Sequence, residues 1–182
     1  MYEPFLKGVR ILDLSQFGPS TTVTQILADM SADVIRVVSP QGDLLISINP
    51  LNGSENGVIF YKRINDGKSL RIDLKSEDGF KVLLSLISSA DVLLESLRPG
   101  VLDKFGFSPQ LNTNKNPKII HCYPIGYSQK SSKSDYGGHD INYITLTGGL
   151  SVTGSNDTPL VGWPLAADFN GAFYSVNAIL SG

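Results

Sequence analysis

Two ionisable side chains near the carboxyl-terminal part of the chain are of the types that transfer protons. His139 follows a pair of glycines and opens a predicted helix, a position from which an imidazole can face a cleft. Asp168 precedes Phe169 and lies in an apolar stretch. A histidine and a carboxylate can serve as acid and base in one site. The spacing leaves a second interpretation open, in which His139 or Asp140 caps one helix and Asp168 caps the next.

Three basic residues lie close to the ends of predicted strands. They are Arg36, Lys68 and Arg98. Ligands of open α/β sheets bind at strand ends, so these cations could together hold a phosphorylated ligand. Each of them could equally be a surface salt-bridge partner. The polar stretch 126–143 adds glycines that let the backbone run close to a ligand.

Several cofactor and metal chemistries lose support from the motifs. The residues after the first predicted strand, 15–20, read Ser-Gln-Phe-Gly-Pro-Ser, which is neither a dinucleotide fingerprint nor a phosphate-binding loop. The single cysteine, Cys122, forms no internal disulfide and belongs to no cluster of metal-ligand spacing. We therefore expect neither a metal site nor a nicotinamide or nucleoside-triphosphate cofactor. The single cysteine also leads us to expect a reducing compartment.

Hydrophobic periodicity predicts the elements that must position these residues. Short β-branched runs at 9–14, 34–38, 69–74, 92–94 and 119–122 predict strands. Apolar residues at helical spacing predict helices after Pro19 and after Ser76, and Ser76 is a suitable N-cap. Alternating strands and helices predict an α/β fold with a doubly wound, mainly parallel sheet.

The 182 residues have the length of one ordinary domain, and 41% apolar and 18% charged residues exclude a disordered tail. A net charge of −2 argues against nucleic-acid binding. No run approaches the roughly 18 apolar residues of a membrane span, and the first residues do not resemble a signal peptide, so we expect an intracellular protein. The only charged residues in 143–182 are Asp157 and Asp168, which indicates that further polypeptide packs over this segment and shields it from solvent.

Six ordered motifs resemble those of the class III CoA-transferase family, closest to its α-methylacyl-CoA racemase branch. They run from about Leu6 to the end of the chain: Gly8–Leu14, Ala32–Val37, Asn65–Ser69, Ala90–Glu95, Arg98–Leu102 and Gly138–Tyr143. The family commonly has glycine at the position of Ser31. The resemblance implies a Rossmann-like large domain and identifies residues 1–182 as its N-terminal, CoA-binding part. The small domain and the C-terminal return of the chain would be absent.

The resemblance implies that His139 and Asp168 are the two bases of a racemase acting on a 2-methylacyl-CoA. Arg36, Lys68 and Arg98 would then contact the nucleotide or phosphates of CoA, and Gly126 and Tyr127 would border the pantetheine. CoA is part of the substrate, so no separate cofactor is implied. Two alternatives remain: a CoA-transferase that uses Asp168 as its acyl-accepting nucleophile, and a CoA-binding remnant without activity. The expected partner is a second copy or the missing half, and the expected location is cytoplasmic, or peroxisomal or mitochondrial in a eukaryote.

Overall fold

A computed structural model describes most of the chain: residues 4–16, 18–43, 68–155, 157–162 and 165–182. Asn65, Asp66 and Gly67 of the predicted third motif lie outside the described residues.

Five strands form one parallel sheet in the order β3-β2-β1-β4-β5, which is the strand order of a Rossmann-like sheet without its last strand. Their bounds are β1 (Arg10–Asp13), β2 (Asp33–Val38), β3 (Lys68–Arg71), β4 (Val92–Leu94) and β5 (Ile120–Cys122). The predicted doubly wound parallel sheet is confirmed. β3 is displaced toward the N-terminus of the predicted run 69–74, because its pairing with β2 ends at Arg71.

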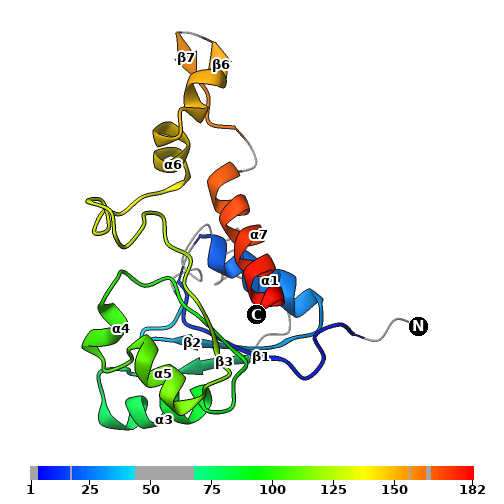
Figure 1. Cartoon of the computed structure of the whole chain (residues 1–182), viewed down its shortest axis with the longest axis vertical. Helices are drawn as coiled ribbons and strands as arrows, with labels where there is room; N and C mark the ends of the chain where they lie inside the picture. Colours follow the sequence, from blue (N-terminus) through cyan, green and yellow to red (C-terminus); the bar gives the residue numbers. More distant parts are fainter. Residues whose placement is uncertain (1–3, 17, 44–67, 156, 163–164) are drawn as a thin grey trace, which may run out of the picture.

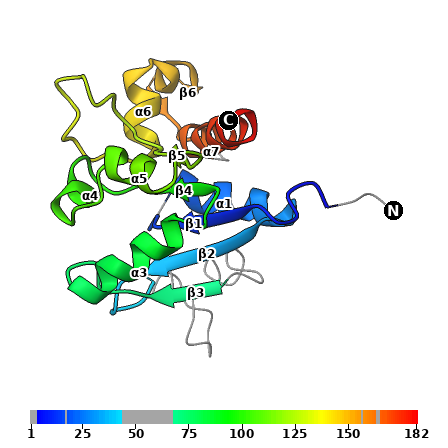
Figure 2. The same ribbon diagram turned by 60° about the horizontal axis from the view of Figure 1, so that its bottom comes forward.

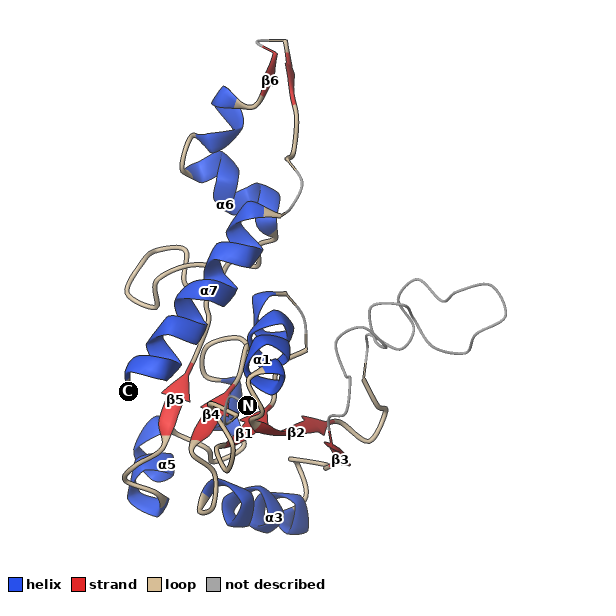
Figure 3. Ribbon diagram, turned by 90° about the vertical axis from the view of Figure 1, so that its right-hand side faces the viewer, coloured by secondary structure: helices blue, strands red, loops and turns tan. Residues whose placement is uncertain are grey.

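Helices cover both faces of this sheet (Figure 3). They are α1 (Pro19–Asp29), α3 (Glu77–Ile87), α4 (Val101–Lys104), α5 (Pro109–Lys115) and α7 (Ala166–Ser181). Figure 2 shows α1 and α7 together on one face, with α3 on the other. Side chains alternate between these faces, as in any strand. Leu12 and Leu93 therefore join the core with α3, whereas Ile11 and Leu94 join the core with α1 and α7.

Local sequence explains where these helices begin and end. The side-chain oxygen of Ser76 accepts a hydrogen bond from the backbone N–H of Gly79 at 3.0 Å, which confirms Ser76 as the N-cap of α3. Pro19 occupies the first turn of α1, where its missing N–H costs nothing. Ser31, just after α1, has a φ of 79°. That left-handed conformation favours glycine, in agreement with the residue common in the resembling family.

A second group of elements stands away from the sheet at the top of Figure 1. It comprises α6 (Asp140–Leu146), a 3-10 helix η2 (Gly149–Val152) and the short hairpin β6 (Gly154–Ser155) and β7 (Thr158–Pro159). α7 then returns from this group toward the sheet and packs along α1. Its outer side chains remain exposed, with Phe173 at 52% and Tyr174 at 77%.

Candidate active site

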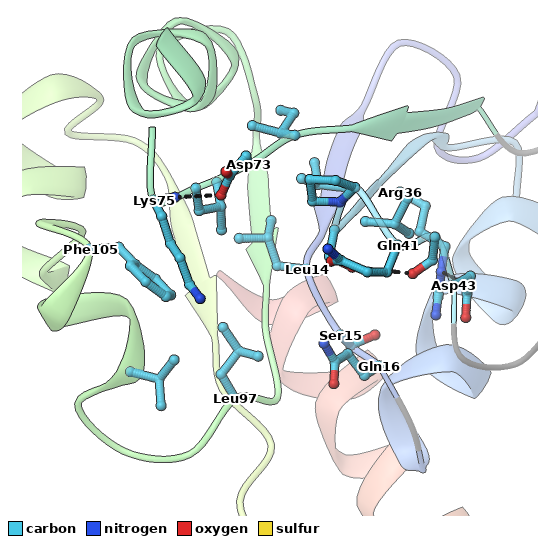
Figure 4. Close-up of a pocket in the computed structure, with 18 residues that line it drawn as sticks. Leu14, Ser15, Gln16, Arg36, Gln41, Asp43, Asp73, Lys75, Leu97 and Phe105 are labelled. Atoms are coloured by element: carbon cyan, nitrogen blue, oxygen red, sulfur yellow. Dashed lines mark hydrogen bonds and ion pairs between the residues drawn. The ribbon is translucent and has the colours of Figure 1, made fainter. Parts of the chain in front are cut away.

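A pocket of about 390 Å³ opens at the carboxyl ends of β1, β2 and β3. Ser15 and Gln16 follow β1, and the turn 39–43 follows β2. Figure 4 shows Lys75 and Phe105 side by side on one wall, with Arg36 and Asp43 on the opposite side. The lining combines apolar side chains with two cations, Arg36 and Lys75, and two carboxylates, Asp43 and Asp73, so it offers both apolar contacts and polar groups to a ligand.

Arg36 lies in this pocket, as predicted for the strand end, but its guanidinium already has two anionic partners. Its Nη1 donates to Asp13 Oδ2 at 2.9 Å, and its Nε pairs with Asp43. Its Nη2 is buried without a hydrogen-bond partner among the described residues. Burial raises the pKa of Asp13, while the Arg36 charge and hydrogen bonds from Ser15 oppose that rise. Arg36 thus keeps one nitrogen that is unpartnered among the described residues but buried, and carboxylates beside it match its positive charge.

Lys68 and Arg98 do not line the pocket that Arg36 lines. The Lys68 ammonium pairs with Asp33 at the start of β2, with 2.6 Å between Nζ and Oδ1. This pairing lowers the pKa of Asp33. Arg98 follows β4, and its Nη2 is 3.7 Å from where a Cβ of Gly137 would stand. Arg36 and Lys68 therefore have different carboxylate partners, and Arg98 lies beside the loop that leads to His139.

The ring of Tyr143, on α6, packs against Gly126 and Tyr127, the two loop residues predicted to border the pantetheine. A Cβ at Gly126 would lie 1.9 Å from the Tyr143 hydroxyl, and one at Gly138 would lie 2.8 Å from the ring carbon Cζ. Only glycine at both positions lets the two backbone segments approach the ring this closely. The Tyr127 ring meets Tyr143 edge-on with 5.3 Å between centroids. Gly126 and Tyr127 thus belong to a single aromatic cluster.

Asp168 faces this cluster from α7. Burial raises the pKa of Tyr143, and the neighbouring Tyr127 and Asp168 raise it further. Tyr143 therefore keeps its proton near neutral pH and remains a hydrogen-bond donor beside a carboxylate.

The junction between α6 and α7 brings His139 and Asp168 into one neighbourhood. His139 is the exposed N-cap of α6, and its backbone N–H donates to Asn142 Oδ1 at 2.8 Å. Asp168 lies in the first turn of α7. The carboxylate of Asp140 accepts hydrogen bonds from the N–H groups of Ala167 at 2.6 Å and Asp168 at 3.0 Å. The interpretation of Asp168 as an N-cap is wrong, because Asp140 supplies the cap of α7 from another helix.

The pocket and this junction are separate but neighbouring parts of the molecule. Neither His139 nor Asp168 lines the pocket. Gly171, one turn beyond Asp168, lies against Pro19 at the start of α1, with 3.5 Å from its Cβ position to the Pro19 Cβ. Ser15 and Gln16, which precede that start, line the pocket. A ligand long enough to extend from the β1–β3 edge past the start of α1 would reach both parts.

Comparisons with known proteins identify this arrangement. The sequence model of CoA-transferase family III matches residues 6–182. The chain belongs to this family. It is 38% identical over 168 residues to a mouse alpha-methylacyl-CoA racemase, covering 91% of this chain and 40% of the racemase. It is 32% identical over 185 residues to a succinate–glutarate CoA-transferase from Agrobacterium fabrum, covering 97% of this chain and 46% of the transferase.

Solved structures of the same family share the fold. A CaiB/BaiF family protein from Brucella suis superposes with a TM-score of 0.90 and 29% identity, covering 97% of this chain and 48% of that protein. A Mycobacterium tuberculosis protein superposes with a TM-score of 0.88 and 26% identity, covering 97% of this chain and 50% of that protein. The chain spans about half the length of these relatives. Its sheet is therefore a partial Rossmann-like domain of a CoA-transferase family III protein.

Three residues of this site escaped sequence reasoning. Lys75 follows β3 by four residues and lines the pocket. A cation so close to a strand end could have been predicted as a ligand contact from the sequence. Tyr143 and Asp140 belong to the motif Gly138–Tyr143, for which the sequence suggested Asp140 only as a cap of its own helix and gave no role to Tyr143. Asp140 binds N–H groups 27 and 28 residues away, and Tyr143 contacts Gly126 and Tyr127, 17 and 16 residues away, so no local pattern reveals these roles.

The described part of the chain offers neither a cluster of metal ligands nor a membrane-spanning helix. Among those residues, no group of three or more histidine, cysteine, aspartate or glutamate side chains could hold a metal ion. Within the same described ranges, no helix is both long and apolar enough to cross a membrane.

Proposed function

We propose that this chain carries the CoA-binding site and both bases of a racemase that acts on a 2-methylacyl-CoA. The observation that supports this most directly is the α6–α7 junction, where Asp140 ties the residue after His139 to the backbone N–H of Asp168. Racemisation needs two groups able to exchange a proton with opposite faces of one carbon. An imidazole and a carboxylate presented from two different helices meet that need.

In the proposed reaction, one base removes the proton from the α-carbon, and the electron pair moves into the thioester to form an enolate. The other base returns a proton to the opposite face of the same carbon. The first base ends protonated and the second deprotonated, so the two states interchange with the direction of reaction. Asp168 and His139 divide these roles according to the configuration of the substrate.

The nucleotide end of CoA would occupy the pocket at β1–β3. There Arg36 Nη2 is buried without a hydrogen-bond partner among the described residues, and the Lys75 ammonium supplies a positive charge in a lining that also contains Asp43 and Asp73. Arg98, Gly126 and Tyr127 would border the pantetheine on its way to the junction. Lys68 stays a predicted contact, although its ammonium pairs with Asp33.

Binding measurements separate Lys75 from Lys68. We expect Lys75→Ala to weaken CoA binding by about tenfold or more, because a hydrogen bond to a charged group contributes about 1.5–3 kcal/mol. We expect Lys68→Ala to change it by less than about threefold, since its partner is Asp33 on the protein. Isothermal titration with CoA measures both, and a larger loss for Lys68→Ala would move the nucleotide away from the pocket.

The proposed partner is more polypeptide of the same enzyme. α7 presents Phe173, Tyr174 and Leu180 to solvent, and the chain spans only about half of its relatives. Further sequence of the enzyme, or a second copy of it, would cover these side chains.

The experiment that tests the chemistry is solvent exchange at the α-carbon in D2O, run on the full natural polypeptide that contains these residues. Racemase activity predicts deuterium at the α-carbon of both enantiomers, together with loss of racemisation in His139→Ala and Asp168→Asn. Unchanged racemisation in both variants would overturn the proposal.

The transferase relative supports a second candidate function, in which Asp168 attacks the thioester and becomes acylated. The Asp168 carboxylate oxygen would form an acyl anhydride as the C–S bond breaks and CoA leaves as the thiolate. That function predicts acyl exchange onto a free acid, an Asp168-acyl mass adduct and no α-exchange. A protein that CoA stabilises against heat without either reaction would be a binding remnant.

A further inference from the structure

The N-terminus of α7 has no cap of its own. Its N-cap residue is Leu165, whose side chain has no hydrogen-bonding group, and no side-chain cap is formed there. The first N–H groups of a helix need partners from outside the helix. Asp140 Oδ1 provides one for both Ala167 and Asp168, from 27 and 28 residues away.

The same carboxylate belongs to the first residue of α6. His139 immediately precedes it, and the Asn142 side chain holds the His139 backbone N–H at 2.8 Å. The first turn of α6 therefore holds the backbone of His139, and Asp140 in the same turn holds the backbone of Asp168.

Asp140 is 4% exposed, and its second oxygen, Oδ2, is buried with no hydrogen-bond partner in the part of the chain that the structure describes. Burying a carboxylate that is only half satisfied is costly, even where the positive end of a helix compensates part of its charge. A serine or threonine would cap α7 locally at a lower cost. The use of a buried carboxylate from another helix as the cap thus indicates a role beyond helix stability.

We propose that Asp140 is a positioning residue that sets the distance between His139 and Asp168. This role rests on the proposed racemase function, because it concerns the cooperation of the two bases. Asp140 itself transfers no proton. Its carboxylate keeps the first turn of α7 in register with the first turn of α6, so that the imidazole and the carboxylate reach opposite faces of one carbon.

If Asp140 positions the two bases, changing it should lower the rate of inversion more than the rate of α-proton exchange with retention. A residue that only stabilises the fold would lower both rates together. Each base can exchange the α-proton of the enantiomer that faces it and return a deuteron to the same face, without help from the other base. Inversion requires both bases at the correct distance. Displacing α7 relative to α6 should therefore lower the ratio of inversion to exchange with retention.

Asp140→Glu is the decisive variant, because it keeps the charge and both acceptor oxygens but lengthens the link by one methylene. We expect the ratio of inversion to exchange to fall about 100-fold, the loss that an ångström-scale misplacement causes. We expect the amide protons of Ala167 and Asp168 to remain protected from hydrogen exchange. Asp140→Asn, which keeps an acceptor at the original length, should retain the ratio within about tenfold. Asp157→Ala, which removes an exposed carboxylate from the β6–β7 turn, is the control and should leave both rates unchanged.

The outcomes distinguish this role from the function on which it rests. If His139→Ala and Asp168→Asn leave racemisation unchanged, the proposed function is wrong and the role of Asp140 falls with it. If those two variants abolish racemisation while Asp140→Glu keeps the normal ratio, only the positioning role is wrong. A fall in both rates by the same factor in Asp140→Glu, with loss of amide protection, would assign Asp140 to stability and also refute the proposal.

Discussion

Gly126→Ala tests whether the aromatic cluster determines the path of the loop that leads to His139. The new methyl group would lie 1.9 Å from the Tyr143 hydroxyl oxygen and 2.2 Å from ring carbon Cζ. Contacts of a Cβ below 3.0 Å are essentially never observed. The Tyr143 ring or the loop must therefore retreat by roughly 1 Å, which disturbs packing on both sides of the ring.

We expect Gly126→Ala to lower the free energy of unfolding by about 1–3 kcal/mol, the usual cost of forcing additional carbon into an occupied space. Urea denaturation followed by circular dichroism measures this change. Gly162→Ala is the matched control, because a Cβ at Gly162 meets nothing within 4 Å and its φ is not in the left-handed region. We expect the control to change stability by less than about 0.5 kcal/mol.

A double variant identifies the contact responsible. Tyr143→Phe should not rescue Gly126→Ala, because Cζ remains 2.2 Å from the new methyl group. Tyr143→Ala should rescue it, with a coupling energy of about 0.5–3 kcal/mol between the two sites. Equal stabilities of Gly126→Ala and Gly162→Ala, or strictly additive effects in the double variant, would refute the reasoning.

Two further predictions concern backbone strain and charge. Ser31→Gly should raise the free energy of unfolding by about 0.5–1 kcal/mol, since it relieves a φ of 79° at some cost in unfolded-chain entropy; thermal denaturation measures this, and a loss of stability would contradict it. Burial raises the pKa of Asp13 above its usual value of 3.8, so the folded protein binds a proton at Asp13 more tightly than the unfolded chain does. Protonation of Asp13 therefore stabilises the fold fully below pH 3.8, and this contribution is lost as the pH rises through the raised pKa. Asp13→Asn should flatten this part of the pH dependence in urea titrations, and an unaltered slope would exclude Asp13 as its source.

The sheet was predictable because its signals are local. β4 covers the predicted residues 92–94, and the Ser76 cap was readable from a serine that precedes an apolar helical pattern. Buried parallel strands require continuous β-branched runs, so the strands appear directly in the sequence. The predicted position of His139 at the start of a helix is likewise confirmed.

The contacts that organise the site depend on residues distant in sequence. Nothing near Arg36 indicates that Asp13, 23 residues earlier, takes one side of its guanidinium. Nothing near Asp168 indicates that its helix is capped by Asp140, 28 residues earlier. Single residues at strand ends and helix starts reveal candidates for a site, whereas tertiary pairing decides which of them are free to meet a ligand.

The packing of α7 on α1 has a consequence for the synthesis of the protein. One face of the sheet is completed only when Ala172, Val176 and Ile179 reach Val23 and Leu27. At about 5–20 residues per second, a ribosome needs roughly seven to thirty seconds to make the intervening chain. During that interval the nascent polypeptide presents an uncovered apolar face, which makes residues 1–165 the segment where we expect chaperone binding, and premature termination there should yield an aggregating product.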